Sequence, residues 1–224
     1  MIMKKFTSLF LAITCLVLLF TLSACSDKAV FEPQSYSSGE AVVNSIVIDV
    51  SDREIEVSVS NDQQVHISYS ESEQEYYDIS LSDSGELSMK LVQDKNWTDY
   101  IGTKPSDEYR KIKLEIPDNL LSDLTVKTTN ESIKVSSLSV LGSISLDSNG
   151  GDLDFEGLSV GKGLQVTAKN GDITGTVKGG LDDFSISCEV KKGESNLPES
   201  KTGGDRSLTA SCNNGDIQID FLTE

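Results

Sequence analysis

The chain has 224 residues, and its 36 Asp and Glu outnumber its 19 Lys and Arg, which gives a formal net charge of −17 at pH 7. Nucleic-acid binding depends on clusters of basic side chains that displace counterions from phosphates, so this balance argues against a nucleic-acid partner. A single His leaves little material for a zinc site or a Ser-His-Asp triad. We therefore expect one domain, or one domain plus a small appendage, without a metal ion or a cofactor.

Residues 1–24 are predicted to be an export signal. Lys4 and Lys5 precede a nearly unbroken apolar run, Leu9 to Phe20, which is too short for a typical membrane-spanning helix. The following run, Leu22-Ser23-Ala24-Cys25, resembles the bacterial lipobox. This resemblance implies cleavage before Cys25 and a diacylglycerol group on its thiol, so that the protein is a lipoprotein on the extracytoplasmic face of the cell membrane. The alternative is an uncleaved membrane anchor.

Residues 25–41 contain Pro, Gly and Ser and lack periodicity, which predicts a lipidated N-terminus followed by a flexible tether. From residue 42 onward, apolar and polar residues alternate in short runs such as Ile46 to Val50 and Ile55 to Val59. Alternation with a period of two is typical of strands with one buried face. We therefore expect an all-β protein, with a strand-rich capping region over residues 42–123.

The second half of the chain, residues 124–224, repeats a short strand pattern with a nearly constant step. The first apolar residues of the five runs are Leu124, Ile144, Leu164, Phe184 and Leu208. Three of the steps are therefore 20 residues and the last is 24. Equivalent positions that recur at one step predict a parallel β-solenoid, a β-helix-like fold in which each coil stacks on the previous one about 4.8 Å away. A β-sandwich of regular hairpins is the competing fold.

Two further motifs accompany the repeats. A strand that ends in Ile-Pro, Lys113 to Pro117, precedes them, and Asn-Gly-Asp-Ile occurs at residues 170–173 and again at 214–217. With these motifs, residues 42–224 resemble a bacterial family of β-strand-repeat domains of unknown function that is commonly labelled "putative adhesin". The resemblance implies an exported or membrane-anchored protein. The family has no established catalytic residues, so none can be assigned here.

Two cysteines remain after the signal and the lipidation site are set aside. Cys188 and Cys212 are expected at the same position of neighbouring coils, where a spacing of about 4.8 Å falls within the Cα separation of about 4.4–6.8 Å that a disulfide spans. Export to an oxidising compartment would allow such a bridge. Small apolar core residues are the equally weighted alternative.

Acidic residues form two patterns with different interpretations. Asp152, Asp172 and Asp216 recur at one turn position, which suggests a calcium ladder, although solvated turn residues are the favoured interpretation. Residues 71–78 combine acids with Tyr76 and Tyr77 and could contact a basic partner, although a solvated loop or edge is favoured.

The segment from residue 92 to residue 109 contains the only Trp of the chain, Trp97, and also Tyr100. Long segments without regular structure tend to be functional, and aromatic side chains on them can bind carbohydrate or peptide. The alternative, slightly favoured, is that the segment covers the open first coil, because terminal repeats need a cap. Trp97 and Tyr100 are therefore candidate partner contacts.

The last coil of the repeats is a candidate site of self-association. Little sequence follows Ile219, so the last coil would expose an edge that either Phe221 and Leu222 or another chain must cover. Together these patterns predict a membrane-anchored binding or scaffold module, in adhesion or in envelope sensing and maintenance, with a protein or glycan partner. A polysaccharide-active β-helix enzyme is the alternative.

Overall fold

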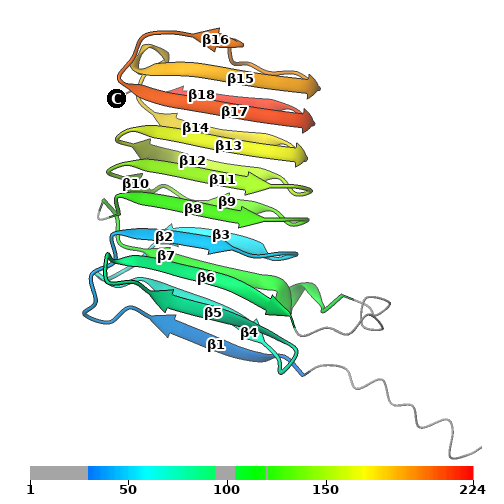
Figure 1. The fold of residues 1–224 in the computed structure, drawn as a ribbon. Coiled ribbons are helices and arrows are strands. Elements are labelled where there is room, and N and C mark those ends of the chain that lie inside the picture. The colour runs from blue at the N-terminus through cyan, green and yellow to red at the C-terminus, as the bar shows by residue number, and fades with distance from the viewer. Residues whose placement is uncertain (1–29, 94–103, 120, 224) are drawn as a thin grey trace, which may run out of the picture. The chain divides into compact units, whose positions relative to one another are not determined.

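The computed structural model describes residues 30–93, 104–119 and 121–223. The predicted signal, Cys25, Trp97 and Tyr100 lie outside these residues. Phe31–Glu224 forms one compact unit (Figure 1). Within the described part of the chain, no helix has the length and apolar character needed to cross a membrane.

The unit is all-β, as predicted, and the described residues form two sheets of nine strands each. In order across the first sheet, the strands are β1 (Glu32–Ser37), β4 (His66–Glu71), β7 (Lys111–Ile116), β3 (Glu54–Val59), β9 (Ile133–Val135), β12 (Leu153–Val160), β14 (Ile173–Lys178) and β18 (Ile217–Leu222), with β10 (Ser139–Val140) beside β12. We call this sheet A.

The second sheet, sheet B, faces sheet A across the core (Figure 1). In order, its strands are β16 (Ser200–Lys201), β15 (Phe184–Lys192), β17 (Arg206–Asn214), β13 (Gly163–Asn170), β11 (Ser143–Ser148), β8 (Asp123–Thr128), β2 (Ser45–Asp49), β6 (Glu86–Gln93) and β5 (Glu75–Leu81). Two short 3₁₀ turns, η2 (Asp107–Arg110) and η3 (Leu181–Asp183), join strands.

From β8 to β14 the chain winds so that each circuit, called a coil here, places a strand in each sheet. In sheet B, Leu124 of β8 pairs in parallel with Ile144 of β11, and Ile144 pairs with Leu164 of β13, which confirms the 20-residue step over these coils. The three side chains point inward and are at most 1% exposed. Burial of an aliphatic side chain contributes about 1.5–3 kcal/mol, so the stacked apolar positions hold the two sheets together.

The coil order departs from the prediction at the C-terminal end. Leu208 of β17 pairs with Leu164 of β13 on one side and with Ile186 of β15 on the other, so β17 lies between the two earlier strands. The expected sequential stacking of these coils is therefore wrong. The 24-residue step is longer than the others, and the segment that it spans includes β16. This extra length allows the chain to pass β15 and to place β17 between β15 and β13.

Matching turns account for this order. The side chain of Asn214 donates a 2.7 Å hydrogen bond to that of Asn170, and the two Asn-Gly-Asp-Ile motifs stack directly on each other. Gly171 and Gly215 have φ values of 150° and 146°, and a Cβ at Gly215 would lie 2.3 Å from the Gly171 carbonyl oxygen. Such close contact favours two identical glycine turns, since it excludes side chains.

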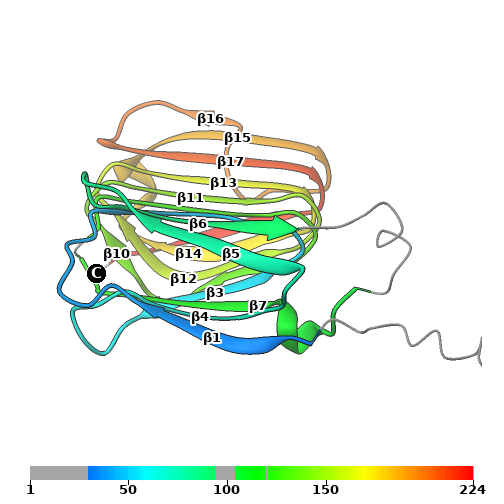
Figure 2. The ribbon, with the colours of Figure 1, turned by 60° about the horizontal axis from the view of Figure 1, so that its bottom comes forward.

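The N-terminal end is arranged in the same way. Ile46 of β2 pairs with Leu124 of β8 on one side and with Leu87 of β6 on the other, so the earliest parallel strand is also enclosed by later ones. The antiparallel strands β1, β4 and β5 lie at this end of the stack (Figure 2). The predicted capping region is thus continuous with the repeats, and residue 123 marks no structural boundary.

The predicted tether is too long. Glu32–Ser37, within the range 25–41, forms β1 and pairs antiparallel with β4 along its whole length. The Phe31 ring also stacks on that of Tyr109, with centroids 5.4 Å apart. This segment alternates weakly, so its strand state depends on the partner strand rather than on its own pattern.

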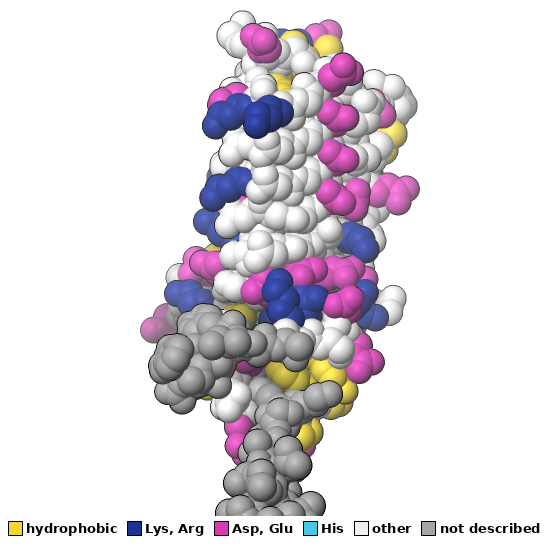
Figure 3. Space-filling view, turned by 90° about the vertical axis from the view of Figure 1, so that its right-hand side faces the viewer, with side chains coloured by type: hydrophobic (Ala, Val, Ile, Leu, Met, Phe, Trp, Pro, Cys, Tyr) yellow, Lys and Arg dark blue, Asp and Glu magenta, His cyan; other side chains and the backbone are white. Residues whose placement is uncertain are grey.

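The repeated aspartates cap backbone groups of the neighbouring coil. The Asp152 carboxylate accepts a 2.9 Å hydrogen bond from the Asp172 N–H, Asp172 accepts one from Asp216, and Asp216 accepts one from Glu194. These acids are exposed, and Figure 3 shows acidic side chains in a column along this edge of the molecule. Among the described residues, no group of three or more His, Cys, Asp or Glu is placed to hold a metal ion.

The edge of β18 is covered by a short segment of the chain rather than left open. The Asn196 side chain donates a 2.9 Å hydrogen bond to the Ile219 carbonyl and accepts a 3.0 Å bond from the Ile219 N–H. The Asn196 N–H donates to the Ile217 carbonyl, and the Ile217 N–H donates to Glu194. The Asn196 amide thus replaces the peptide group of a missing strand, and it covers backbone groups that were expected to be exposed here.

We predict that Asn196→Ala lowers the free energy of unfolding by about 1–3 kcal/mol, because the Ile219 N–H and C=O lose their partners. An open strand edge favours pairing between chains, so concentration-dependent association should also increase. Urea unfolding and analytical ultracentrifugation measure the two effects. Gln165→Ala, an exposed substitution on β13, is the control and should change neither. Equal behaviour of the two variants would contradict the capping role.

Candidate binding site

A buried arginine joins the antiparallel end of the molecule to the coils. Arg53 is 1% exposed, and it lies two residues before Ile55. The aligned turn position is Glu131 in the next coil and glycine in the coils of Leu153 and Ile173. The Arg53 Nη2 lies 2.5 Å from a carboxylate oxygen of Glu75, which is also buried. A buried charge must be paired to be tolerated, so this ion pair fixes β5 against the turn before β3.

Tyr77 completes this buried cluster. The Arg53 Nε donates a 2.7 Å hydrogen bond to the Tyr77 hydroxyl, and the Tyr77 ring packs edge-on against Tyr69 with centroids 5.0 Å apart. Burial raises the pKa of Tyr77, so its hydroxyl remains protonated. Tyr77 is 8% exposed, so the interpretation of this residue as a partner contact is wrong, whereas Tyr76, its neighbour on β5, is 43% exposed. The alternation of a strand places the two rings on opposite faces.

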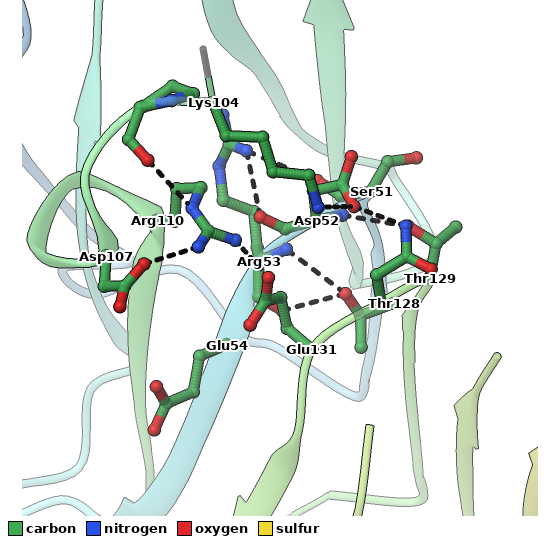
Figure 4. A network of polar contacts seen from close by, with 12 residues as sticks. Ser51, Asp52, Arg53, Glu54, Lys104, Asp107, Arg110, Thr128, Thr129 and Glu131 are labelled. Carbon is green, nitrogen blue, oxygen red and sulfur yellow. Dashed lines mark hydrogen bonds and ion pairs between the residues drawn. The ribbon is translucent and has the colours of Figure 1, made fainter. Parts of the chain in front are cut away.

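A second ionic cluster lies on the same turn edge, and Figure 4 shows its side chains converging. Arg110 pairs with Glu131 and Asp107, and its Nε donates a 3.0 Å hydrogen bond to the Pro105 carbonyl. Burial lowers the pKa of Arg110, but the two carboxylates outweigh burial and raise it overall. These contacts anchor η2 to the turn between β8 and β9.

Two acids beside this cluster are held in the ionised form. Burial raises the pKa of Asp52, but hydrogen bonds from Asn130 and Lys104 outweigh it, so the pKa lies below its ordinary value. Burial likewise raises the pKa of Glu54, and Lys134 and Lys111 lower it overall. Groups with depressed pKa values stabilise the fold above their unfolded pKa, and this contribution is lost as pH falls through the folded pKa. The clusters are thus structural.

We predict that Arg53→Met lowers the free energy of unfolding by about 3–5 kcal/mol, because it leaves the Glu75 carboxylate buried without its guanidinium. The double variant Arg53→Met/Glu75→Leu should recover most of that loss, since apolar side chains can replace a buried pair. Urea unfolding gives the comparison. Lys104→Met breaks the exposed pair with Asp52 and should cost less than about 1 kcal/mol. A double variant as unstable as the single one would contradict this account.

The outer face of sheet B carries a row of uncharged polar side chains. Thr125, Ser145, Gln165, Thr209 and Ser187 lie side by side on five neighbouring parallel strands, as the register shows. All five are at least partly exposed, and no large exposed apolar side chain of the described residues lies on these strands. The row therefore offers hydrogen-bond donors and acceptors at a regular strand spacing of about 4.8 Å.

The outer face of sheet A contains a shallow cleft of about 350 Å³ beside β1 and β4. His66 lies in it, with Nε2 placed 3.0 and 3.1 Å from the two carboxylate oxygens of Asp62. Glu115 of β7 is the cross-strand partner of His66 and also lines the cleft. Two carboxylates and an imidazole are the groups that the enzyme alternative requires.

The protonation of Asp62 argues against acid catalysis there. A backbone hydrogen bond from Gln64, and then the contact with His66, lower the pKa of Asp62. A glycosidase needs one carboxylic acid with a raised pKa that can protonate the leaving group. Asp62 is held as a carboxylate instead, so it can accept hydrogen bonds but cannot serve as that acid.

The two cysteines are buried and free, and their register differs from the prediction. Cys188 pairs with Ala210, whereas Cys212 pairs with Val190 and Ala168, so the cysteines are offset by two residues on adjacent strands. That offset implies a Cα separation of about 8 Å, beyond the range of about 4.4–6.8 Å for a disulfide. The expectation of equivalent positions is wrong, because the alignment of β17 with β15 is shifted by two residues from the one that the repeat pattern predicts.

Cys212 has a structural role instead. Its thiol donates to the Gly171 carbonyl at 3.3 Å, as the Ser148 hydroxyl donates to Glu131 at 3.0 Å at the equivalent strand end. Burial raises the pKa of the Cys212 thiol, which keeps it protonated and unreactive at neutral pH.

A scan against protein-family models matches residues 43–221 to the family described as Toastrack DUF4097. The match covers most of the chain. The protein belongs to the Toastrack DUF4097 family. This finding confirms the resemblance that the strand repeats and the Asn-Gly-Asp-Ile motifs predict.

Two solved structures extend the comparison. A "putative cell adhesion protein" from Clostridium sporogenes matches with a TM-score of 0.60 and 12% identity, over 87% of this chain and 100% of its own. A "putative adhesin" from Bacteroides fragilis matches with a TM-score of 0.36 and 12% identity, over 86% of this chain and 97% of its own. The first likeness shows a shared fold. No curated protein gives a significant match.

Sequence reasoning missed the buried Arg53 and the edge contact of Asn196. A weak signal for Arg53 was present, because charged residues, Arg53, Arg110 and Glu131, stand at the aligned turn position where the later coils have Gly151, Gly171 and Gly215. Asn196 lies in an irregular segment whose partner, β18, is brought alongside only by the reversed order of the coils. No local pattern indicates that contact.

Proposed function

We propose that this Toastrack protein is a non-catalytic binding or scaffold module, held by lipid at Cys25 on the extracytoplasmic face of the cell membrane. The observation that carries the proposal is the uncharged polar row on the outer face of sheet B. The stacked coils would form a rigid β-solenoid that presents this face to ligands. The lipobox resemblance at the end of the export signal supports the anchor.

The composition of the row favours a glycan over a protein partner. Cores of protein interfaces are rich in aromatic side chains, Met and Arg, whereas this row contains hydroxyl groups and one amide, Gln165. The absence of a basic cluster on it argues against an anionic ligand. The name of the Clostridium protein as a "putative cell adhesion protein" is compatible with such a role at a cell surface.

The anchor is tested by Cys25→Ser, which removes the thiol that the lipid would modify. We expect the variant to move from the membrane fraction to the soluble fraction, and to lose incorporation of labelled fatty acid. The neighbouring substitution Ser26→Ala is the control and should leave the protein in the membrane. Retention of the Cys25→Ser protein in the membrane, with label still incorporated, would contradict the lipid anchor.

The binding face is tested with cell envelopes from the source bacterium. We expect the double variant Ser145→Lys/Thr209→Lys to sediment with envelopes at least tenfold more weakly than the unchanged protein, because two long charged side chains would cover the row. Thr174→Lys/Gln218→Lys adds the same charge to the outer face of sheet A and should bind normally. Equal binding by both variants would contradict a role for sheet B.

The second candidate function is a polysaccharide-active enzyme, which the cleft containing His66, Asp62 and Glu115 favours by its composition. The depressed pKa of Asp62 weighs against it. Release of reducing ends or unsaturated sugars from envelope polysaccharide by the unchanged protein, and loss of this activity in Glu115→Gln, would support the enzyme over the binding module.

A further inference from the structure

The cleft on sheet A is built by three neighbouring strands and one loop. Ser37 of β1, His66 of β4 and Glu115 of β7 form one cross-strand row on the outer face. Asn61 and Asp62, in the loop between β3 and β4, line the same cleft. Its volume of about 350 Å³ lies at the lower end of the range of about 300–1,000 Å³ typical of small-ligand sites.

The charge in this cleft is negative and fixed on one side. Asp62 accepts a 2.8 Å hydrogen bond from the Gln64 N–H and contacts His66, so its carboxylate is held in place. Its lowered pKa keeps it ionised at neutral pH. Lys113, the nearest base along β7, is the cross-strand partner of Ser68, but it is not among the lining residues.

Glu115 gives the cleft a free acceptor. It is partly buried, and its carboxylate makes no hydrogen bond or ion pair with any described side chain. The hydroxyl groups of Ser35 and Ser68 add neutral donors and acceptors, whereas the Ser37 hydroxyl already donates a 2.7 Å hydrogen bond to the Gln64 side chain. An ammonium group donates three hydrogen bonds and favours carboxylate acceptors, and hydroxyl groups pair with one another.

We propose that this cleft binds an amino sugar with a free amine, through its protonated amino group at Glu115 and Asp62 and its hydroxyl groups at the serines. The lone ammonium of a lysine side chain would leave the serines without partners. A metal ion is a poorer fit, because no group of three ligating side chains is placed for one among the described residues. The proposal rests on the proposed binding function and adds a second site to it.

The single His of the chain makes the test selective, because one imidazole signal reports on this cleft alone. The protein is titrated with glucosamine at constant pH, and the ¹H–¹⁵N signals of the His66 ring are followed. We expect a saturating shift with glucosamine, and at least tenfold weaker effects with N-acetylglucosamine and with lysine amide. The acetylated sugar keeps the hydroxyl groups but lacks the charge, and lysine amide keeps the charge but lacks the hydroxyl groups.

Matched variants separate binding from folding. Glu115→Gln should weaken the glucosamine response at least tenfold while leaving the melting temperature within a few degrees of the original. Glu156→Gln removes an exposed carboxylate from β12 on the same sheet and should respond like the unchanged protein. An equal response to N-acetylglucosamine, a response to lysine amide alone, no saturation with glucosamine, or full binding by Glu115→Gln would each overturn the proposal.

The glucosamine test and the envelope-binding test can fail independently, so failure of the amino-sugar site is distinguishable from failure of the proposed function. If glucosamine fails to bind while Ser145→Lys/Thr209→Lys still abolishes envelope binding, the amino-sugar site is wrong and the binding face on sheet B stands. If glucosamine binds the His66 cleft while the sheet B variants sediment normally, the site stands and the role of sheet B is wrong.

Discussion

The structure depends on the direct stacking of equivalent turns. Each turn of the repeats leaves backbone N–H groups that the strands cannot satisfy, and the carboxylate of the neighbouring coil accepts them, as Asp152 does for Asp172 and Asp172 for Asp216. Each of these hydrogen bonds links one coil to the next, so a coil is stabilised by a neighbouring coil whose turn supplies a matching acceptor. This constraint favours the 20-residue register and is consistent with the position of β17 beside β13, between β13 and β15.

The open strand edges at the two ends of the stack are covered in different ways. At one end, the Asn196 amide takes the place of a strand beside Ile219. At the other, antiparallel strands cover the first coils, and the buried pair of Arg53 and Glu75 fixes them. Both devices need a polar group with all its partners in place, because an edge of this length would otherwise invite strand pairing with another chain.

The same regularity positions the surfaces that can bind. A parallel register brings side chains such as Thr125, Ser145 and Thr209 into a line on the outer face of sheet B, although they are far apart in the sequence. The cleft on sheet A arises where this regularity ends, since the antiparallel β1 and β4 bring His66 beside Glu115 and leave room under the β3–β4 loop. Recognition is thus expected on a flat repeated face and at one irregular end.

The sequence by itself determined the all-β class, the 20-residue step from Leu124 to Leu164 and the family, because period-two alternation and repeated Asn-Gly turns are local signals. Only the tertiary structure decided which coils are neighbours. That order places Cys188 opposite Ala210, buries Tyr77 against Arg53 and brings Asn196 to the edge of β18. The physical reason is that strands of similar apolar pattern can pair in several orders, and the fit of turn to turn, together with the burial of one paired charge, selects among them.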